Sequence, residues 1–301
     1  MDESAVKSWK KAGKVAAEAL QYGTTLMKPG VPVMEVLDKV EAFIEKKGAE
    51  IGFPAQSSLN DFAAHSCPED ESVTYKEGDV AKLDVGTHVE GYVADNATTL
   101  EIGGGKIHEA LIKASRAALN RAIKKLEPGV TTSEIGREIQ EEIVSRGFAP
   151  VINLSGHGLG QWQVHSAPSY PNYDTKQGPK IKENAVFALE PFATNGEGVV
   201  QDSGNATVFM QRMKKPVRSP FARELLQKIE TYNGLPFTTR WLTRELGQGK
   251  TKLGLKELER LDIIRSYAPL QDRRNGLVSQ AEHCFLMQDK VTVLTQLDDW
   301  P

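Results

Sequence analysis

The sequence repeats itself at an offset of 99 residues. Residues 27–31 read Met-Lys-Pro-Gly-Val, and residues 126–130 read Leu-Glu-Pro-Gly-Val. The same offset aligns six further identical pairs: Lys14 with Lys113, Ala19 with Ala118, Leu20 with Leu119, Glu35 with Glu134, Ile44 with Ile143 and Gly48 with Gly147. A solenoid would need at least three stacked copies. Two copies therefore predict one unit with a pseudo-twofold axis.

Each copy predicts a pair of helices followed by strands. A helical pattern ends at Pro-Gly, a second begins after a short turn, and a glycine ends it. The predicted pairs are 4–26 with 33–47, and 107–125 with 132–146. Thr131 and Glu134 have the spacing of a capping box at the start of the fourth helix. We therefore predict an α+β fold with a site at its pseudo-twofold axis.

Five polar residues lie in or beside the apolar runs of the predicted strands: Asp84, Asp95, His157, Glu190 and Glu282. Four of the runs are 80–85, 92–95, 185–190 and 280–286. An unpaired charge costs several kcal/mol in such a position. Four inward-pointing carboxylates also repel one another, and few lysines or arginines lie near them in sequence. Metal cations with mostly oxygen ligands and one imidazole would balance this charge.

The spacing of the two aspartates predicts a β-hairpin. Glu90 and Gly91 lie midway between them, and a two-residue turn there pairs Val89 with Tyr92. In that register Asp95 lies opposite Gly86 and diagonal to Asp84 on the same face. Diagonal Cα atoms are roughly 7–8 Å apart, so both aspartates can bind the same ions. The alternative is a pair of aspartates on a solvated strand face.

The composition is that of an ordinary globular protein, with 301 residues, 26% of them charged, and a net charge of −3. No apolar stretch approaches the 18 residues of a transmembrane helix, and Met1 is followed by two acidic residues instead of a signal sequence. Two cysteines give no disulfide framework. These features predict a cytoplasmic protein without membrane contact.

Residues 211–270 differ in charge from the rest of the chain. They contain thirteen lysines and arginines against six acidic residues, a net charge of +7, so the remainder carries −10. Short amphipathic patterns joined by Gly and Pro turns predict a helical, winged-helix-like insertion. The main domain would then comprise residues 1–210 and 271–301. The insertion could contact RNA or a ribosome, or it could be a solvated helical cap.

Four motifs together give the chain a specific resemblance. They are residues 83–88 (Leu-Asp-Val-Gly-Thr-His), 153–158 (Asn-Leu-Ser-Gly-His-Gly), 189–192 (Leu-Glu-Pro-Phe) and 280–283 (Gln-Ala-Glu-His). From residue 4 to residue 300 the chain resembles the methionine aminopeptidases of the pita-bread metallopeptidase family. The basic insertion makes it similar to the type II branch, which is archaeal and eukaryotic. The long charged N-terminal extension usual in the eukaryotic members is lacking.

This resemblance implies a site with two divalent ions, which could be Co, Mn, Fe or Zn. Asp95 and Glu282 would bridge the ions, Asp84 would complete the shell of one, and His157 and Glu190 that of the other. The implied substrates are nascent proteins and peptides that begin with methionine. A monomer is expected, and the basic insertion allows for contact with the ribosome.

The resemblance also implies catalytic and substrate-binding residues. His65 and His165 match two histidines that flank the active site without binding metal, and both could contact the substrate carbonyl and the tetrahedral intermediate. Glu190 would move a proton from water to the leaving amine. Phe53 matches a position in the methionine pocket, and Phe192 and Met210 are further candidates. The alternative for His65 and His165 is a core or surface position with ordinary hydrogen bonds, and for the aromatic residues a position in the core.

Two other functions are compatible with the pita-bread fold. An aminopeptidase P or prolidase would use the same ligand types on Xaa-Pro peptides, but usually carries a separate N-terminal domain, for which residues 1–3 leave no room. A non-catalytic pita-bread binding protein would keep partner contacts after losing ligands, and the intact ligand set argues against it. Turnover of Met-Xaa peptides, of Xaa-Pro peptides, or of neither distinguishes the three.

Overall fold

The computed structural model describes residues 1–297. Its first half builds one helix pair and the strands that follow it: α1 (Glu3–Leu26), α2 (Val33–Lys46), β1 (Glu50–Leu59), β2 (Phe62–Ala64), β3 (Val80–Val89) and β4 (Tyr92–Glu101). The second half repeats this order: α3 (Glu109–Lys125), α4 (Thr132–Ser145), β5 (Ala149–Pro150), β6 (Ser155–Gly160), β7 (Gln163–Pro171), β8 (Val186–Leu189), β9 (Phe192–Thr194) and β10 (Val200–Asp202).

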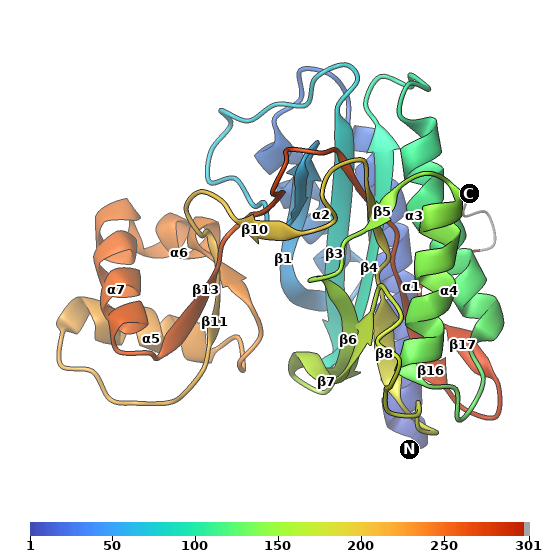
Figure 1. The fold of residues 1–301 in the computed structure, drawn as a ribbon. Helices are drawn as coiled ribbons and strands as arrows, with labels where there is room; N and C mark the ends of the chain where they lie inside the picture. The colour runs from blue at the N-terminus through green and yellow to red at the C-terminus, as the bar shows by residue number, and fades with distance from the viewer. Residues whose placement is uncertain (298–301) are drawn as a thin grey trace.

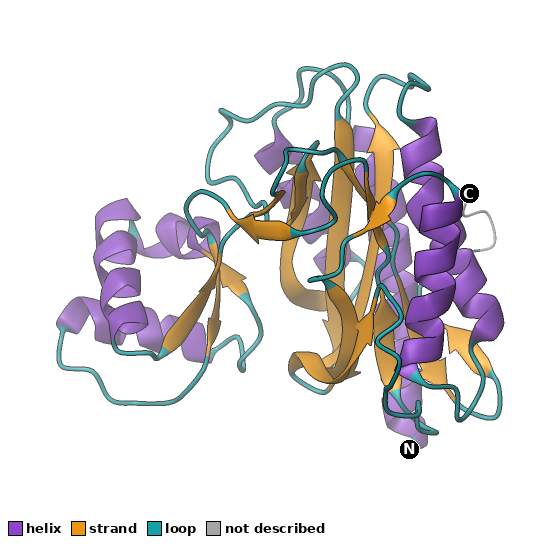
Figure 2. Ribbon diagram, in the orientation of Figure 1, coloured by secondary structure: helices purple, strands orange, loops and turns teal. Residues whose placement is uncertain are grey.

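The last third of the chain contains a separate group of elements and then returns to the main sheets. The group consists of β11 (Val208–Gln211), α5 (Pro220–Glu230), β12 (Phe237–Thr238), α6 (Thr239–Leu246), α7 (Gln248–Arg260) and β13 (Ile264–Tyr267). The returning strands are β14 (Leu270–Asp272), β15 (Val278–Gln280), β16 (His283–Met287) and β17 (Val291–Val293). Figures 1 and 2 show the separate group on the far side of the strands from α3 and α4.

The two helix pairs obey the predicted repeat. α2 and α4 begin 99 positions apart and end 99 positions apart. The Pro-Gly turns before them use Gly30 and Gly129 at φ 84° and 90°, a conformation that glycine adopts without strain. The capping box at α4 is present, because Thr131 Oγ1 accepts from the Glu134 amide and Glu134 Oε2 accepts from the Thr131 amide.

Each helix pair packs on the strands of its own half and forms its own core. α1 and α2 pack on the sheet β1-β3-β4, with a core built around side chains such as Leu37 and Leu83. α3 and α4 pack on the sheets β17-β16-β8-β6-β7 and β15-β9-β5, around side chains such as Ile139 and Phe187. None of the described helices combines the length and apolar character needed to cross a membrane.

The predicted β-hairpin is confirmed. Val89 pairs with Tyr92 and Gly86 with Asp95. Both turn residues, Glu90 and Gly91, have positive φ, as a type I′ turn requires. The hairpin therefore places Asp95 diagonal to Asp84 on one face of the sheet.

The two halves of the molecule meet where β4 approaches the start of β16. The backbone amide of Glu282 donates to the Ala97 carbonyl over 2.9 Å and forms an isolated bridge between the two sheets. Glu282 thus lies at the junction between β4 of the first half and β16 of the second. The repeat predicts its pseudo-twofold axis at such a junction between the two halves.

The separate group has a hydrophobic core of its own. It combines the three helices with a three-stranded sheet in the order β12-β11-β13. Phe209, just before residue 211, belongs to this core. The group therefore contains short strands as well as helices. The amphipathic patterns predicted only the helices.

Candidate metal centre

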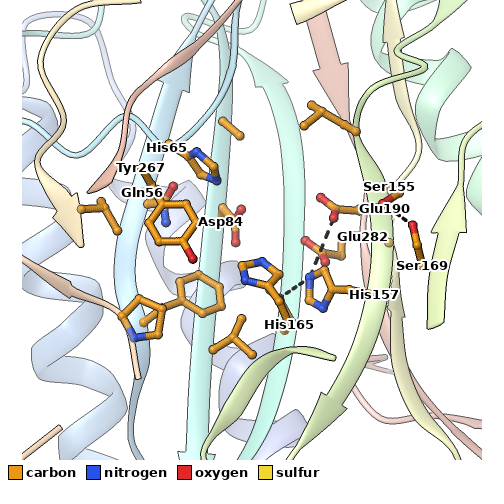
Figure 3. Close-up of a pocket in the computed structure, with 18 of the residues that line it drawn as sticks. Gln56, His65, Asp84, Ser155, His157, His165, Ser169, Glu190, Tyr267 and Glu282 are labelled. Carbon is orange, nitrogen blue, oxygen red and sulfur yellow. Dashed lines mark hydrogen bonds and ion pairs between the residues drawn. The ribbon is translucent and has the colours of Figure 1, made fainter. Parts of the chain in front are cut away.

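The structure brings Asp84, Asp95, His157, Glu190 and Glu282 together at the wall of a single cavity of about 760 Å³, called here the central cavity (Figure 3). Asp84 and Asp95 come from β3 and β4, and His157 from β6. Glu190 directly follows β8, and Glu282 directly precedes β16. The His157 Nε2 atom lies 3.6 Å from Asp95 Oδ2 and 3.8 Å from Glu190 Oε1. Ligand atoms of Asp95, His157 and Glu282 all lie within 4.8 Å of one another.

Ionisation of the four carboxyl groups is unfavourable in this buried cluster. Burial raises the pKa of Asp84 to about 7. Burial, and then the charges of Asp84 and Glu190, raise the pKa of Asp95 well above its usual value. The pKa values of Glu190 and Glu282 are raised for the same two reasons, burial first and neighbouring carboxylates second. A cation between these groups would remove both penalties.

The residues present fit divalent metal ions. The buried oxygens Asp84 Oδ1 and Asp95 Oδ1 have no hydrogen-bond partner within the described chain. The His157 Nδ1–H group donates to the Gly158 carbonyl over 3.3 Å, and this tautomer leaves the Nε2 lone pair facing Asp95 and Glu190. Carboxylates with one imidazole form a donor set that Co, Mn, Fe and Zn accept.

Gln280 supports two of the carboxylates, a role that was not predicted from the sequence. Its Nε2 group donates to Glu190 Oε2 and to Glu282 Oε2, each over 3.4 Å. The Thr99 hydroxyl fixes the Gln280 backbone by donating to its carbonyl and accepting from its amide. Strand alternation could have indicated this role, because the side chains of residues 280 and 282 lie on the same face of an extended segment.

Two further histidines face the same cavity. The His165 ring centroid lies 4.5 Å from that of His157, and the His65 ring contacts Tyr267 at 5.5 Å. His65 has a φ of 65°, a strained backbone conformation for a non-glycine residue. Burial lowers the pKa of His65. Partial desolvation in the cavity wall, followed by the influence of His157, His65 and Arg265, lowers the pKa of His165, although its side chain remains exposed to the cavity. Both rings are therefore neutral at neutral pH.

The predicted pocket residues Phe53, Phe192 and Met210 also line the central cavity. The separate group contributes part of the wall through Pro236 and Tyr267. Figure 3 shows the Tyr267 ring beside His65, across the cavity from Glu190 and Glu282. No role for Tyr267 was predicted from the sequence, because this residue falls in the stretch predicted to be an insertion.

Comparisons with known proteins identify the family. Residues 7–212 match the family model described as metallopeptidase family M24. A methionine aminopeptidase of Pyrococcus abyssi is 42% identical over 95% of this chain and 97% of its own length. One of Archaeoglobus fulgidus is 39% identical over 98% of this chain and 99% of its own length. A methionine aminopeptidase structure from Thermotoga maritima superposes with a TM-score of 0.73 at 22% identity, covering 99% of this chain and 98% of that one.

These findings confirm the predicted fold class, family and enzyme type. The structural neighbour supports the pita-bread fold, and the relatives support metal-dependent removal of N-terminal methionine. The number and identity of the metal ions, and the role of each residue at the cavity, stay predictions. The chain belongs to the M24 metallopeptidase family, among its methionine aminopeptidases, and is a metal-dependent hydrolase.

Proposed function

We propose that this protein removes the N-terminal methionine from nascent polypeptides in the cytoplasm, with two divalent ions bound by Asp84, Asp95, His157, Glu190 and Glu282. One observation carries the proposal: four carboxylates and one imidazole from both halves of the fold converge on one cavity. Arg265 also lines this cavity, but no lysine or arginine of the described chain is paired with the four carboxylates. Two bound ions would supply Lewis acidity, lowering the pKa of water and polarising the scissile carbonyl.

The protein's own groups then have distinct tasks. Glu190 faces the cavity beside His157 and can carry a proton from water to the leaving amine. His165 is neutral and accessible in the cavity wall, so its N–H can donate to the substrate carbonyl as negative charge develops on the oxygen. Phe53, with Phe192 and Met210, provides an apolar wall for the methionine side chain.

The hydrogen bond of His65 refines its proposed role. A carbonyl oxygen can only accept, so the contact of His65 Nδ1 with the Ala268 carbonyl over 3.2 Å places the proton on Nδ1. The neutral ring then presents Nε2 as an acceptor. His65 is therefore better suited to accept from the peptide N–H or the leaving amine than to donate to the carbonyl.

Turnover of Met-Ala-Ser by metal-depleted protein, after adding back Co, Mn, Fe or Zn singly, tests the proposal. We expect activity to return with about two equivalents of bound metal, measured by elemental analysis. Glu282→Gln should reduce kcat at least about 100-fold. Glu141→Gln, which removes an exposed carboxylate on α4, is the matched control and should retain activity. The proposal would be contradicted if the metal-loaded protein hydrolysed only Xaa-Pro peptides, or if it bound Met-Ala-Ser without hydrolysing it.

We also propose that residues 211–270 form an insertion in a monomeric catalytic unit made of residues 1–210 and 271–301, and that the insertion contacts the ribosome. Lys214, Lys215, Arg218 and Arg223 are exposed, and no acidic partner is seen for them among residues 1–297. Such a basic segment attracts the phosphates of RNA.

Co-sedimentation with ribosomes tests the proposed contact. The variant Lys214→Glu/Lys215→Glu should sediment less than the parent, and raising the salt concentration should weaken parent binding. Lys7→Glu/Lys10→Glu makes the same charge change on exposed positions of α1 and serves as the control. Equal losses in both variants would show a non-specific charge effect and contradict the assignment to the insertion.

A further inference from the structure

Strand β1 contains a bulge at the wall of the central cavity. Phe53 pairs with Gly86 and Gln56 with Asp84, so Pro54 and Ala55 together oppose the single residue Val85. Residues three positions apart on a regular strand face opposite sides. The extra residue places Phe53 and Gln56 on the same side, where both line the central cavity. The shape of this wall therefore depends on the bulge.

The bulge needs a hydrogen-bond acceptor from outside the sheet. Ala55 has no partner in the β1-β3 register, and its backbone N–H donates to Glu41 Oε1 over 3.1 Å. Glu41 lies on α2 and is only 6% exposed. Leaving a buried N–H without an acceptor costs about 1–3 kcal/mol. The Glu41 carboxylate thus stabilises the bulged conformation of β1.

Arg240 fixes the Glu41 carboxylate from the other side. Its Nη2 donates to Glu41 Oε1 over 2.7 Å and its Nη1 to Glu41 Oε2 over 3.0 Å. Trp241 Nε1 donates to the same Oε2 over 2.9 Å. Arg240 is 2% exposed, lies near the start of α6, and also pairs with Asp38. A continuous set of hydrogen bonds therefore links α6, through α2, to the cavity wall.

We propose that Glu41 and Arg240 are positioning residues for the methionine pocket: together they fix the β1 bulge that directs Phe53 and Gln56 at the substrate side chain. This inference rests on the proposed function, because it takes the central cavity as the methionine site. Neither residue lines that cavity. Their loss should change substrate affinity and side-chain selectivity while leaving the metal ligands and the chemical step in place.

Two variants separate positioning from simple stabilisation. Glu41→Leu/Arg240→Leu replaces a buried ion pair with apolar groups, an exchange that proteins often tolerate without loss of stability. It leaves the Ala55 N–H without its acceptor, while Asp38 keeps its pair with Arg244. Glu41→Gln instead retains an amide oxygen that can accept from Ala55. Lys250→Met is the control, because it breaks the exposed pair Lys250–Glu224 between α7 and α5, and neither of these residues lines a cavity with β1.

For Met-Ala-Ser, the double variant should raise KM about tenfold or more with kcat within about threefold of the parent, and its preference for methionine over norleucine should fall. Glu41→Gln and Lys250→Met should stay within about threefold of the parent in KM. An unchanged KM in the folded double variant, or a fall in kcat alone, would overturn the inference. Inactivity of the metal-loaded parent would contradict the proposed function instead.

Hydrogen exchange tests the same inference without activity. Peptides covering residues 50–59 should exchange faster in the double variant than in the parent, with parent-like exchange in Glu41→Gln and Lys250→Met. If the double variant does not fold, Glu41→Ala is measured in its place, with the same expected rise in KM and in exchange. Unchanged exchange across β1 in the folded variant would overturn the inference even if the parent proved inactive.

Discussion

The ammonium group of Lys82 lies two residues from Asp84 in sequence, but it donates its hydrogen bonds elsewhere. It reaches the carbonyl oxygens of Asn60 at 2.8 Å, Val278 at 2.9 Å and Val80 at 3.2 Å. Burial lowers its pKa to about 7. Lys82 thus holds backbone segments together and is not paired with the carboxylates. Arg265 lines the central cavity without forming an ion pair with them in the described chain, so bound cations are the expected source of balancing charge.

Glu282→Gln should therefore stabilise the metal-free protein. The substitution removes one of four buried, mutually repelling carboxylates and keeps the side-chain shape. In the presence of chelator, the variant should melt at a higher temperature than the parent by differential scanning fluorimetry. Adding Mn or Co should raise the melting temperature of the parent and leave that of the variant nearly unchanged. A variant that melts lower without metal and still responds fully to it would contradict this prediction.

Gly86 is required by the close approach of Phe53. A Cβ atom at position 86 would stand 2.1 Å from Phe53 Cε1 and 2.2 Å from Cδ1. Gly86→Ala should therefore displace the Phe53 ring, lower stability by about 1–3 kcal/mol and raise KM for methionine peptides. Urea unfolding and steady-state kinetics measure the two effects.

Gly249→Ala in α7 is the matched control, since nothing lies within 4 Å of its added Cβ. Alanine favours the helix over glycine by up to about 1 kcal/mol, so this variant should gain stability and keep the parent KM. If the two alanine variants had the same stability and the same KM, the contact between Gly86 and Phe53 would have no effect on either quantity.

At the scale of elements, the parts predicted correctly were those encoded by local patterns. The ends of α2 and α4, the capping box and the β3-β4 hairpin depend on residues a few positions apart. The pairing of β11 with β13 joins residues more than fifty positions apart, and no local pattern signals it. For the same reason the sequence did not reveal that Tyr267, at the end of β13, would reach the central cavity.

The capping box of α4 offers a test at this scale. Thr131→Ala removes the hydroxyl that accepts from the Glu134 amide and should cost about 1 kcal/mol of unfolding free energy. Thr131→Ser keeps the hydroxyl and should lose much less. Both should retain the parent kcat, because the cap does not line the central cavity. Chemical denaturation gives the difference, and equal stabilities for the alanine and serine variants would exclude a contribution from the cap.

At the scale of the whole molecule, the candidate ligands are divided between the two halves. Asp84 and Asp95 belong to the first half, and His157, Glu190 and Glu282 to the second. Without cations, carboxylates repel one another across the junction where β4 meets β16. With cations bound, the same groups would hold the halves together. The pseudo-twofold repeat explains this division, since each copy of the helix pair is followed by strands that carry ligands.

Metal loading should therefore protect the junction more than the rest of the molecule. Hydrogen exchange of peptides covering residues 93–99 and 280–286 should slow about tenfold or more when Mn or Co is added to metal-free protein, because opening this region would then expose bound ions. The Glu282 amide, which donates to the Ala97 carbonyl across the junction, should show the largest change. Peptides of α7, which lies outside both halves, should be unaffected and serve as an internal control. Uniform slowing throughout the chain, or protection confined to one half, would show that the ions do not join the two halves.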